Sequence, residues 1–208
     1  MRLTLAQRSN FLPPVAWGYS AWRAASLSLL SNAPFSLGRE ARLFLGHVRL
    51  HPGEHWLDIG TSTGFYAGVL AGVGARITAL DLSPAMLRAG ARRHPDPRIA
   101  WVQGNAESLP ARWQGQFDGV TVGATLNETY DSEQLLTEAA RVLRPGGKLW
   151  LMYLRAIGGQ LQQRLSRPAW GGLTFPAPAA VDAWLPECPL AAAAQFGAVR
   201  FELRLKDG

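Results

Sequence analysis

The sequence predicts an α/β fold in which helices cover both faces of a mostly parallel sheet. Strand-like and helix-like segments alternate over residues 55–154, the pattern of parallel strands joined by crossover helices. An apolar run from Trp56 to Ile59 precedes a glycine-containing turn and a helix-like run, the order found in a nucleotide-binding corner. The length of 208 residues is enough for one sizeable core and short for two. We therefore expect a single domain.

The first 50 residues are expected to be helical and irregular, because apolar residues recur there at helical spacing. The sequence "HPGE" at 51–54 then stops the helix. Five strand-like segments follow, at 55–60, 76–81, 98–105, 117–124 and 148–154.

Three helices are expected between these strands. The first covers 64–73, and the second has Ser83 as its N-cap and Pro84 at its first helical position. The third runs over 132–143 with one apolar face, and "RPGG" ends it.

The C-terminal part of the chain has a different pattern. A segment rich in Pro, Gly and Trp follows Arg155, and then come the small-residue stretch "LAAAAQF" and the stretch "VRFELRLK" at 199–206. The last alternates apolar and charged residues, which is typical of a strand with one face in water. The short turn between the two stretches indicates an antiparallel hairpin.

The net charge of +6 admits a nucleic-acid or an anionic-membrane partner. The arginines are scattered along the chain, with no run longer than Arg92-Arg93. We therefore interpret the charge as a feature of composition and consider a nucleic-acid partner the less favoured alternative.

The single cysteine, Cys188, excludes an internal disulfide framework and a cysteine-rich zinc site. It fits a reducing compartment. No apolar run has the length of a membrane span, and the N-terminal residues lack the apolar stretch of a signal peptide. We expect a soluble cytoplasmic protein, as a monomer or a homodimer. His47, His51 and His55 recur every four residues, but Pro52-Gly53 breaks the helix between them, so we predict no metal site.

Ligands of open α/β sheets bind at the carboxyl ends of the strands. Asp81 ends the second strand, 21 residues after Gly60, and a carboxylate there can accept bonds from both ribose hydroxyls. The alternative, a cap for the next helix, is less favoured because Ser83 takes that role. Asn105 and Ala106 end the third strand and are candidates to contact an adenine edge, or else form an ordinary turn.

Four stretches, in this order and at these spacings, resemble the class I S-adenosylmethionine-dependent methyltransferases, and most of all the small-molecule group typified by menaquinone and ubiquinone methyltransferases. They are "WLDIGTSTGFYAGVLAGVGARITALDLSPAML", "GNAESLP", "FDGVTVG" and "EAARVLRPGGKLWL". The resemblance covers about half of the chain. It implies a Rossmann-like, seven-stranded sheet whose last strand is antiparallel and lies between the fifth and the sixth.

The resemblance also assigns a cofactor site for S-adenosylmethionine, with S-adenosylhomocysteine as the product. The family's loop reads acid-x-G-x-G-x-G, and here its places are filled by Asp58, Gly60, Ser62 and Gly64. The Ser62 hydroxyl is able to donate a bond to the cofactor carboxylate, so we expect binding to be retained. The implied contacts are Gly60 and Thr61 with the methionine part, Asp81 with the ribose, Leu82 and Met86 with the adenine face, Asn105 and Ala106 with the adenine rim, and Gly123 below the sulfonium.

A sulfonium is already an activated electrophile, so a dedicated catalytic base is optional. Asn127 and Glu128 are candidates to orient or deprotonate an acceptor hydroxyl. Tyr19 resembles the family's N-terminal lid tyrosine. In each case an ordinary loop or core role is the competing interpretation.

We divide the domain into an N-terminal helical lid (1–50), a cofactor-binding core (51–154), a substrate-side insert (155–190) and a C-terminal hairpin (191–208). The lid and the insert are rich in aromatic and apolar residues. They predict an enclosed apolar cavity and a small aromatic or lipophilic acceptor. The alternatives are that these aromatics only extend the core, that the acceptor is RNA, and that the protein binds the cofactor without catalysis.

Overall fold

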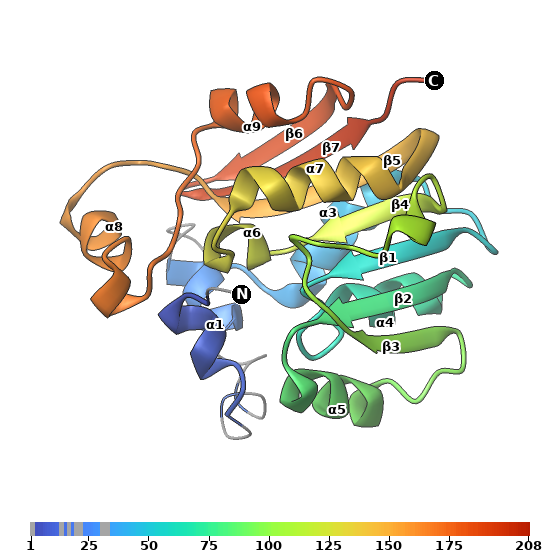
Figure 1. The fold of residues 1–208 in the computed structure, drawn as a ribbon, viewed down its shortest axis with the longest axis horizontal. Helices are drawn as coiled ribbons and strands as arrows, with labels where there is room; N and C mark the ends of the chain where they lie inside the picture. Colours follow the sequence, from blue (N-terminus) through green and yellow to red (C-terminus); the bar gives the residue numbers. More distant parts are fainter. Residues whose placement is uncertain (1–2, 13–14, 16–17, 19–22, 30–33) are drawn as a thin grey trace.

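The computed structural model describes residues 3–12, 15, 18, 23–29 and 34–208. Its centre is a seven-stranded sheet in the order β3-β2-β1-β4-β5-β7-β6 (Figure 1). The first five strands are parallel, and β7 lies antiparallel between β5 and β6. This arrangement confirms the expected fold class. The strands are β1 (His55–Ile59), β2 (Arg76–Asp81), β3 (Ile99–Gln103), β4 (Phe117–Val122), β5 (Leu143–Leu154), β6 (Leu190–Phe196) and β7 (Val199–Leu205).

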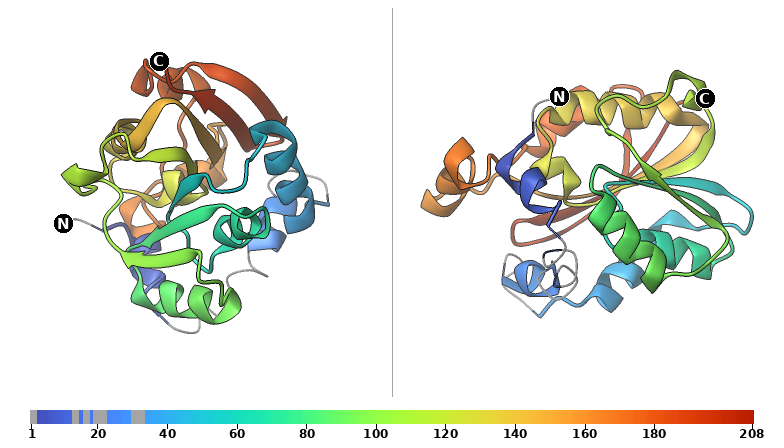
Figure 2. Two further views of the ribbon diagram at one scale, coloured as in Figure 1. Left: turned by 90° about the vertical axis from the view of Figure 1, so that its right-hand side faces the viewer. Right: turned by 60° about the horizontal axis from the view of Figure 1, so that its bottom comes forward.

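Helices cover both faces of the sheet, each over its own apolar cluster (Figures 1 and 2). On one face, Phe44 of α3 and Leu70 of α4 pack against the sheet residues Trp56 and Trp150. On the other, Leu135 of α7 belongs to the same cluster as sheet residues such as Val120. The helices are α1 (Leu5–Ser9), α3 (Leu37–Val48), α4 (Phe65–Gly72), α5 (Pro84–Arg93), α6 (Thr125–Glu128), α7 (Ser132–Val142), α8 (Gln160–Leu165) and α9 (Pro178–Trp184), with short 3-10 turns at η1 (Ala111–Trp113) and η2 (Pro168–Trp170).

The start of β5 differs from the expectation from sequence. Helix α7 ends at Val142, as its pattern predicts, but the "RPGG" residues that follow it lie within the strand rather than before it. Leu143 is already paired with Phe117 of β4, and the N–H of Gly146 donates to the carbonyl of Lys206. Pairing on both sides extends the strand beyond what its apolar run predicts.

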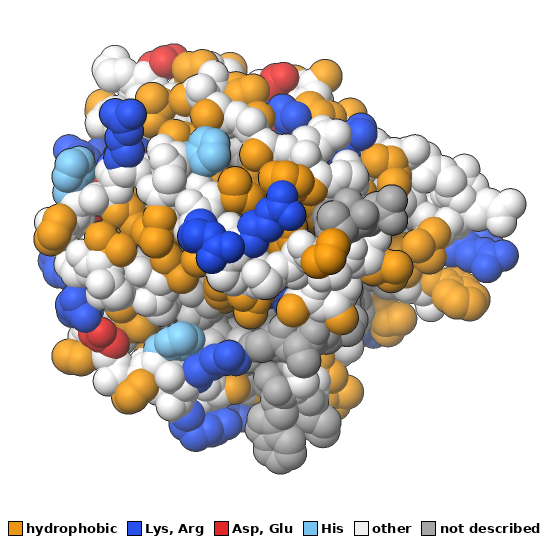
Figure 3. All heavy atoms as spheres, turned by 180° about the vertical axis from the view of Figure 1, so that it is seen from behind, with side chains coloured by type: hydrophobic (Ala, Val, Ile, Leu, Met, Phe, Trp, Pro, Cys, Tyr) orange, Lys and Arg blue, Asp and Glu red, His pale blue; other side chains and the backbone are white. Residues whose placement is uncertain are grey.

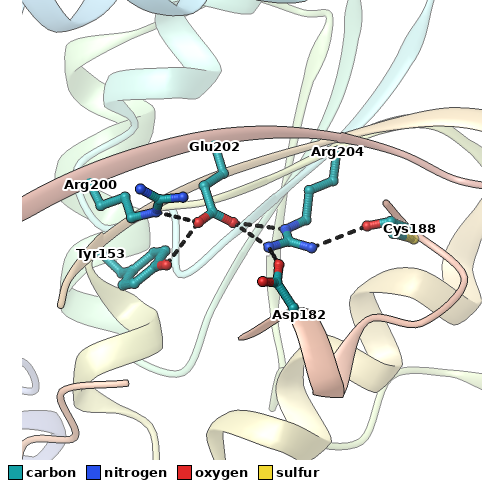
Figure 4. Close-up of polar contacts among 6 residues, drawn as sticks. All are labelled: Tyr153, Asp182, Cys188, Arg200, Glu202 and Arg204. Carbon is teal, nitrogen blue, oxygen red and sulfur yellow. Dashed lines mark hydrogen bonds and ion pairs between the residues drawn. The ribbon is translucent and has the colours of Figure 1, made fainter. Parts of the chain in front are cut away.

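The expectation that the last strand has one face in water is wrong. Strand β7 is flanked by β5 and β6, and Glu202 and Arg204 are 0% and 1% exposed. Their charges are paired with each other, since Arg204 Nε donates to Glu202 Oε2 at 2.7 Å (Figure 4). The hydroxyl of Tyr153 donates to Glu202 Oε1 at 2.8 Å, and Arg204 Nη2 donates to Asp182 Oδ1 at 2.5 Å. The alternating pattern therefore reflects a buried ion-pair network.

The N-terminal segment crosses the carboxyl edge of the sheet and contacts the insert. The N–H of Ala6 in α1 donates to the carbonyl of Gly171 at 3.3 Å, and the hydroxyl of Thr4 donates to the carbonyl of Glu128 at 2.7 Å. Residues 23–29 are helical, and Arg23 forms an ion pair with the buried Glu40 of α3. In the part of the chain that the structure describes, no helix combines the length and the apolar character needed to cross a membrane.

Candidate cofactor and acceptor site

The loop between β1 and α4 contains backbone angles that glycine adopts more easily than other residues. Gly60, Ser62 and Gly64 all have positive φ angles, of 63°, 53° and 82°. A Cβ atom on Gly60 would lie 1.8 Å from Oγ1 of Thr125, so no side chain fits there. Ser62 adopts the left-handed conformation as a non-glycine residue, which costs about 1–2 kcal/mol. The sequence difference at this position is thus accommodated by backbone strain, and the shape of the loop is kept.

The Asp58 side chain fixes this loop by hydrogen bonds. Its carboxylate accepts bonds from the hydroxyls of Thr61 at 2.6 Å and Thr121 at 2.7 Å, and from the N–H of Ala67 at 3.2 Å. Burial raises the pKa of Asp58 to about 6, although these hydrogen bonds act in the opposite direction. The role of this side chain in the structure is to connect the loop to β4 and α4.

Asp81 ends β2 and faces the same loop. The N–H of Ser62 donates to its Oδ2 and the N–H of Ser83 to its Oδ1, both at 2.8 Å. Each carboxylate oxygen has two lone pairs, so both oxygens retain acceptor capacity for a ligand. Burial raises the pKa of Asp81, while the backbone donors oppose that shift. A fixed carboxylate with acceptor capacity suits a pair of ribose hydroxyls.

Two small hollows have Gly60 and Thr125 as shared lining residues. The first has a volume of about 50 Å³ and the second about 20 Å³. Of the residues predicted for the site, the first hollow is lined by Gly60, Asp81, Leu82, Asn105, Ala106 and Glu128. The second is lined by Asp58, Gly60, Thr61, Ser62 and Gly123. The structure thus gathers these predicted residues at one edge of the sheet.

Three of the predicted residues that the structure describes line neither hollow. Gly64 packs beneath Trp101, where a Cβ would lie 2.6 Å from the indole ring. Met86 is buried, and the Ser62 hydroxyl lies 3.5 Å from its sulfur. Asn127 is described below. Tyr19 lies outside the described residues.

These hollows suit S-adenosylmethionine in their chemistry. The first joins an acidic acceptor, Asp81, to the apolar side chains of Leu82 and Ala106. In the second, a Cβ built on Gly123 would be in van der Waals contact with the Tyr66 ring, 3.7 Å away, so a side chain there would occupy the space beside the backbone. Pockets for ligands of this size have volumes of roughly 300–1,000 Å³. The two hollows are smaller than this range, and a covering segment closes the first.

That covering segment is α1 with the residues after it. Gln7, Asn10 and Phe11 line the first hollow. The hydroxyl of Ser83 donates to the carbonyl of Asn10 at 2.6 Å, and the amide of Asn10 donates to Glu128 Oε2 at 2.9 Å. Two side-chain hydrogen bonds thus join Asn10 to the sheet edge.

A third and larger cavity, of about 530 Å³, adjoins the first hollow. Its walls come from the N-terminal segment and the insert, through apolar residues such as Leu5, Val15, Trp170 and Leu173. Glu128 lines both this cavity and the first hollow, and it is the one acidic or basic side chain among the described residues around the cavity. Burial, with a smaller contribution from the nearby charge of Asp81, raises the pKa of Glu128 to about 7, although the hydrogen bond from Asn10 acts in the opposite direction.

Asn127 and Glu128 are adjacent but serve different regions. The Asn127 amide donates to the carbonyls of Leu154 and Thr174, at 2.8 and 2.7 Å, and its Oδ1 accepts from the N–H of Leu154 at 2.8 Å. Its side chain therefore joins the end of β5 to the insert, whereas the side chain of Glu128 borders the cavity.

Two residues of the site carry no sequence signal that would have identified them. Thr125 lines both hollows and its hydroxyl donates to the carbonyl of Gly60 at 3.3 Å. Arg23 lines the second hollow, with its guanidinium 5.2 Å from the centre of the Phe65 ring. Among the described aromatic residues of the lid and insert, Phe35 belongs to the core and Trp170 lines the cavity.

Comparison with known proteins agrees with this geometry. The methyltransferase domain family matches residues 57–151. The demethylmenaquinone methyltransferase of Renibacterium salmoninarum is 37% identical over 123 residues, which are 58% of this chain and 51% of the relative. The ubiquinone biosynthesis O-methyltransferase of Xanthomonas oryzae pv. oryzae is 32% identical over 158 residues, 70% of this chain and 63% of the relative.

A similar fold is found in a methyltransferase solved in complex with the Haloferax volcanii Trm112 methyltransferase activator. The TM-score is 0.75 at 15% identity, with 94% of this chain and 97% of that chain covered. Identity at this level establishes the fold alone. The chain spans about half the length of the demethylmenaquinone methyltransferases it matches.

Proposed function

We propose that the chain, whose residues 57–151 match the methyltransferase domain family, is a class I S-adenosylmethionine-dependent methyltransferase that transfers a methyl group to a small lipophilic or aromatic acceptor held in the apolar cavity. The observation that carries this proposal is the position of Glu128. It borders the hollow that contains Asp81 and also the cavity of about 530 Å³. A cofactor on one side and an acceptor on the other would meet beside its carboxylate.

The cofactor, when bound, supplies the methyl group as an electrophile on a positively charged sulfur. Asp81 would hold the ribose hydroxyls, and Leu82, Asn105 and Ala106 would surround the adenine. The loop residues Gly60 to Ser62, together with Gly123, would hold the methionine part. Binding there fixes the direction in which the methyl group points and leaves the chain to align the acceptor and to exclude water.

Glu128 is the group we assign to proton transfer. A carboxylate whose pKa is raised to about 7 is partly ionised near neutral pH, which is where a general base is most useful. Its Oε1 would accept the proton from an acceptor hydroxyl as the oxygen attacks the methyl carbon. The bond from Asn10 to Oε2 fixes the orientation of the carboxylate.

The lining of the cavity supports an acceptor of low polarity. Trp170, Leu5 and Leu173 offer aromatic and aliphatic surface. The relatives reported above are named as a demethylmenaquinone methyltransferase and a ubiquinone biosynthesis O-methyltransferase. A hydroxylated aromatic ring with an apolar substituent combines the features that these walls and Glu128 would accept. The free, buried Cys188 fits a reducing compartment, and we place the protein in the cytoplasm as a monomer or a homodimer.

The test is transfer of label from an isotopically labelled methyl donor to a metabolite extract. The proposal expects label in the lipophilic fraction, and loss of that label in the Glu128→Gln variant. Label recovered in RNA would favour a macromolecular acceptor. Absence of label from every fraction, in protein that binds S-adenosylhomocysteine, would favour a cofactor-binding module without catalysis.

A further inference from the structure

The net positive charge of the chain lies in the two segments that frame the acceptor cavity. Residues 1–39 and 155–181 contain seven arginines and no aspartate or glutamate. The whole chain has 21 basic and 15 acidic residues, so the remainder carries 14 basic against 15 acidic residues and is close to neutral. The arginines look evenly scattered along the sequence, but the net positive charge is concentrated in these two segments.

Several of these arginines are exposed beside exposed apolar side chains. Arg8 lies on α1 next to Leu5, which is 49% exposed. Arg164 lies on α8 with Leu161, and Arg167 lies just after the helix. The side chains of Leu161 and Trp170 are 60% and 63% exposed. We call this surface the α1–α8 face, defined by Leu5, Arg8, Ile157, Leu161, Arg164, Arg167 and Trp170.

The elements of this face are neighbours in space as well as in composition. Helix α1 contacts η2, and η2 contacts α8, so the three form one surface at the carboxyl edge of the sheet (Figures 1 and 2). In the view from behind, basic and apolar side chains lie side by side on the projection at the right, the side on which α8 lies (Figure 3). Leu5 and Trp170 belong to this face and also line the apolar cavity.

We propose that the α1–α8 face docks on the surface of an anionic lipid bilayer, from which the acceptor passes into the cavity. This inference rests on the proposed function, because it supplies the source of a lipophilic acceptor. Arginines at the rim would pair with lipid phosphates, and Leu161, Ile157 and Trp170 would enter the interfacial layer. The cavity walls continue from that layer through Leu5 and Trp170 to Glu128.

The mixed character of the face favours a bilayer over RNA as the partner. RNA contacts rely on positive charge together with stacking and hydrogen-bonding groups, and exposed leucine and isoleucine side chains add nothing to phosphate binding. In a bilayer interface the same apolar side chains are removed from water, while the arginines remain at the level of the head groups.

The experiment is sedimentation of the full chain with vesicles, with neither cofactor nor acceptor present. One set of vesicles is pure phosphatidylcholine, and the other contains equal parts of phosphatidylcholine and phosphatidylglycerol. The protein should sediment only with the anionic vesicles, and less so as salt is raised. The double variant Arg164→Gln/Arg167→Gln should bind about 30-fold more weakly, since each surface arginine contributes roughly a factor of five near an anionic bilayer.

The matched control is Arg92→Gln/Arg112→Gln, which removes the same charge from exposed sites on α5 and η1 and should bind as the parent does. Leu161→Gln should also weaken binding, and Leu190→Gln, an exposed position on β6, should not. Equal losses in the two arginine variants would overturn the proposal, because binding would then follow net charge alone.

Two further outcomes separate this proposal from the proposed function. Protein that binds S-adenosylhomocysteine in calorimetry but not anionic vesicles would overturn membrane docking and leave methyl transfer standing. Binding to single-stranded polyuridylate that depends on Arg164 and Arg167, without vesicle binding, would assign the face to RNA and overturn the proposal. Vesicle binding without binding of S-adenosylhomocysteine would instead contradict the cofactor site.

Discussion

The two halves of the site are built in different ways. On the cofactor side, Asp58 and Asp81 each accept bonds from loop backbone or hydroxyl groups, so the shape is set by parallel strands that end at one edge. On the acceptor side, the walls come from segments far apart in the sequence, α1 and the insert, which meet through bonds such as that of Ala6 to Gly171. From this comparison we expect single changes at backbone positions to disturb the cofactor side more than the acceptor side.

The largest effect is expected for Gly60→Ala. The new Cβ would lie 1.8 Å from Oγ1 of Thr125 at a φ of 63°, so the loop must shift. Strain and overpacking together should reduce the free energy of unfolding by about 2–5 kcal/mol and abolish detectable cofactor binding. Denaturant unfolding measures the first effect and calorimetry the second.

Gly115→Ala is the matched control, because Gly115 has nearly the same φ, 64°, and no neighbouring atom within 4 Å of its Cβ. It should show the cost of the backbone angle alone. Equal losses in the two variants would mean that Thr125 does not constrain the loop.

The next effect concerns Glu128 and the acceptor side. Glu128→Gln should lower the turnover number by about 100-fold or more while cofactor affinity is kept, since the amide cannot accept the proton. In the parent, the rate should rise with pH and level off above about 7, the pKa of the half-buried Glu128 carboxyl. Glu133→Gln, at an exposed position of α7, should change neither quantity.

Ionisation of Glu128 should lower the free energy of unfolding as the pH rises, whereas it should raise the rate. Because its folded pKa is raised from 4.5 to about 7, the unfolded chain loses its proton first as the pH rises. The part of the stability that depends on Glu128 should therefore fall between about pH 4.5 and 7 and stay constant above. If the methyl-transfer rate did not change with pH across this range, Glu128 would not be the base.

The smallest effect is expected for Ser62→Gly. Glycine relieves the left-handed backbone at φ 53°, but its greater freedom in the unfolded chain offsets part of that gain. The free energy of unfolding should therefore rise by at most about 1 kcal/mol. Arg49→Gly, at φ 48°, is the matched control, since it is the other described non-glycine residue with positive φ. Cofactor affinity should be nearly unchanged in both. Cofactor binding that appears only in Ser62→Gly would show that the serine blocks the site.

The cofactor side could be predicted from the sequence more fully than the acceptor side. Asp81, Asn105 and Gly123 were predictable because the carboxyl ends of parallel strands meet at one edge. Thr125 was not, because its role depends on how closely α6 approaches the Gly60 loop. Asn127 and Glu128 could not be separated in advance, since neighbouring helical residues point about 100° apart and only the packing of α6 decides which one faces the cavity.

The buried face of β7 was missed for a related reason. Alternation of charged and apolar residues ordinarily marks a wet face, but the pairing of Glu202 with Arg204 and Tyr153 satisfies these groups inside the fold. Such pairing depends on β5 and α9, which the local pattern does not contain.

The central claim is that the edge formed by the Gly60 loop and Asp81 binds S-adenosylmethionine. Calorimetry of S-adenosylhomocysteine with the parent and the Asp81→Ala variant tests it most directly, with Asp96→Ala as a control at a carboxylate that lines neither hollow and whose partner is Arg98. Loss of hydrogen bonds to a charged group should weaken binding by about 10- to 100-fold in Asp81→Ala and leave Asp96→Ala unchanged. Equal affinity in all three proteins would contradict the account.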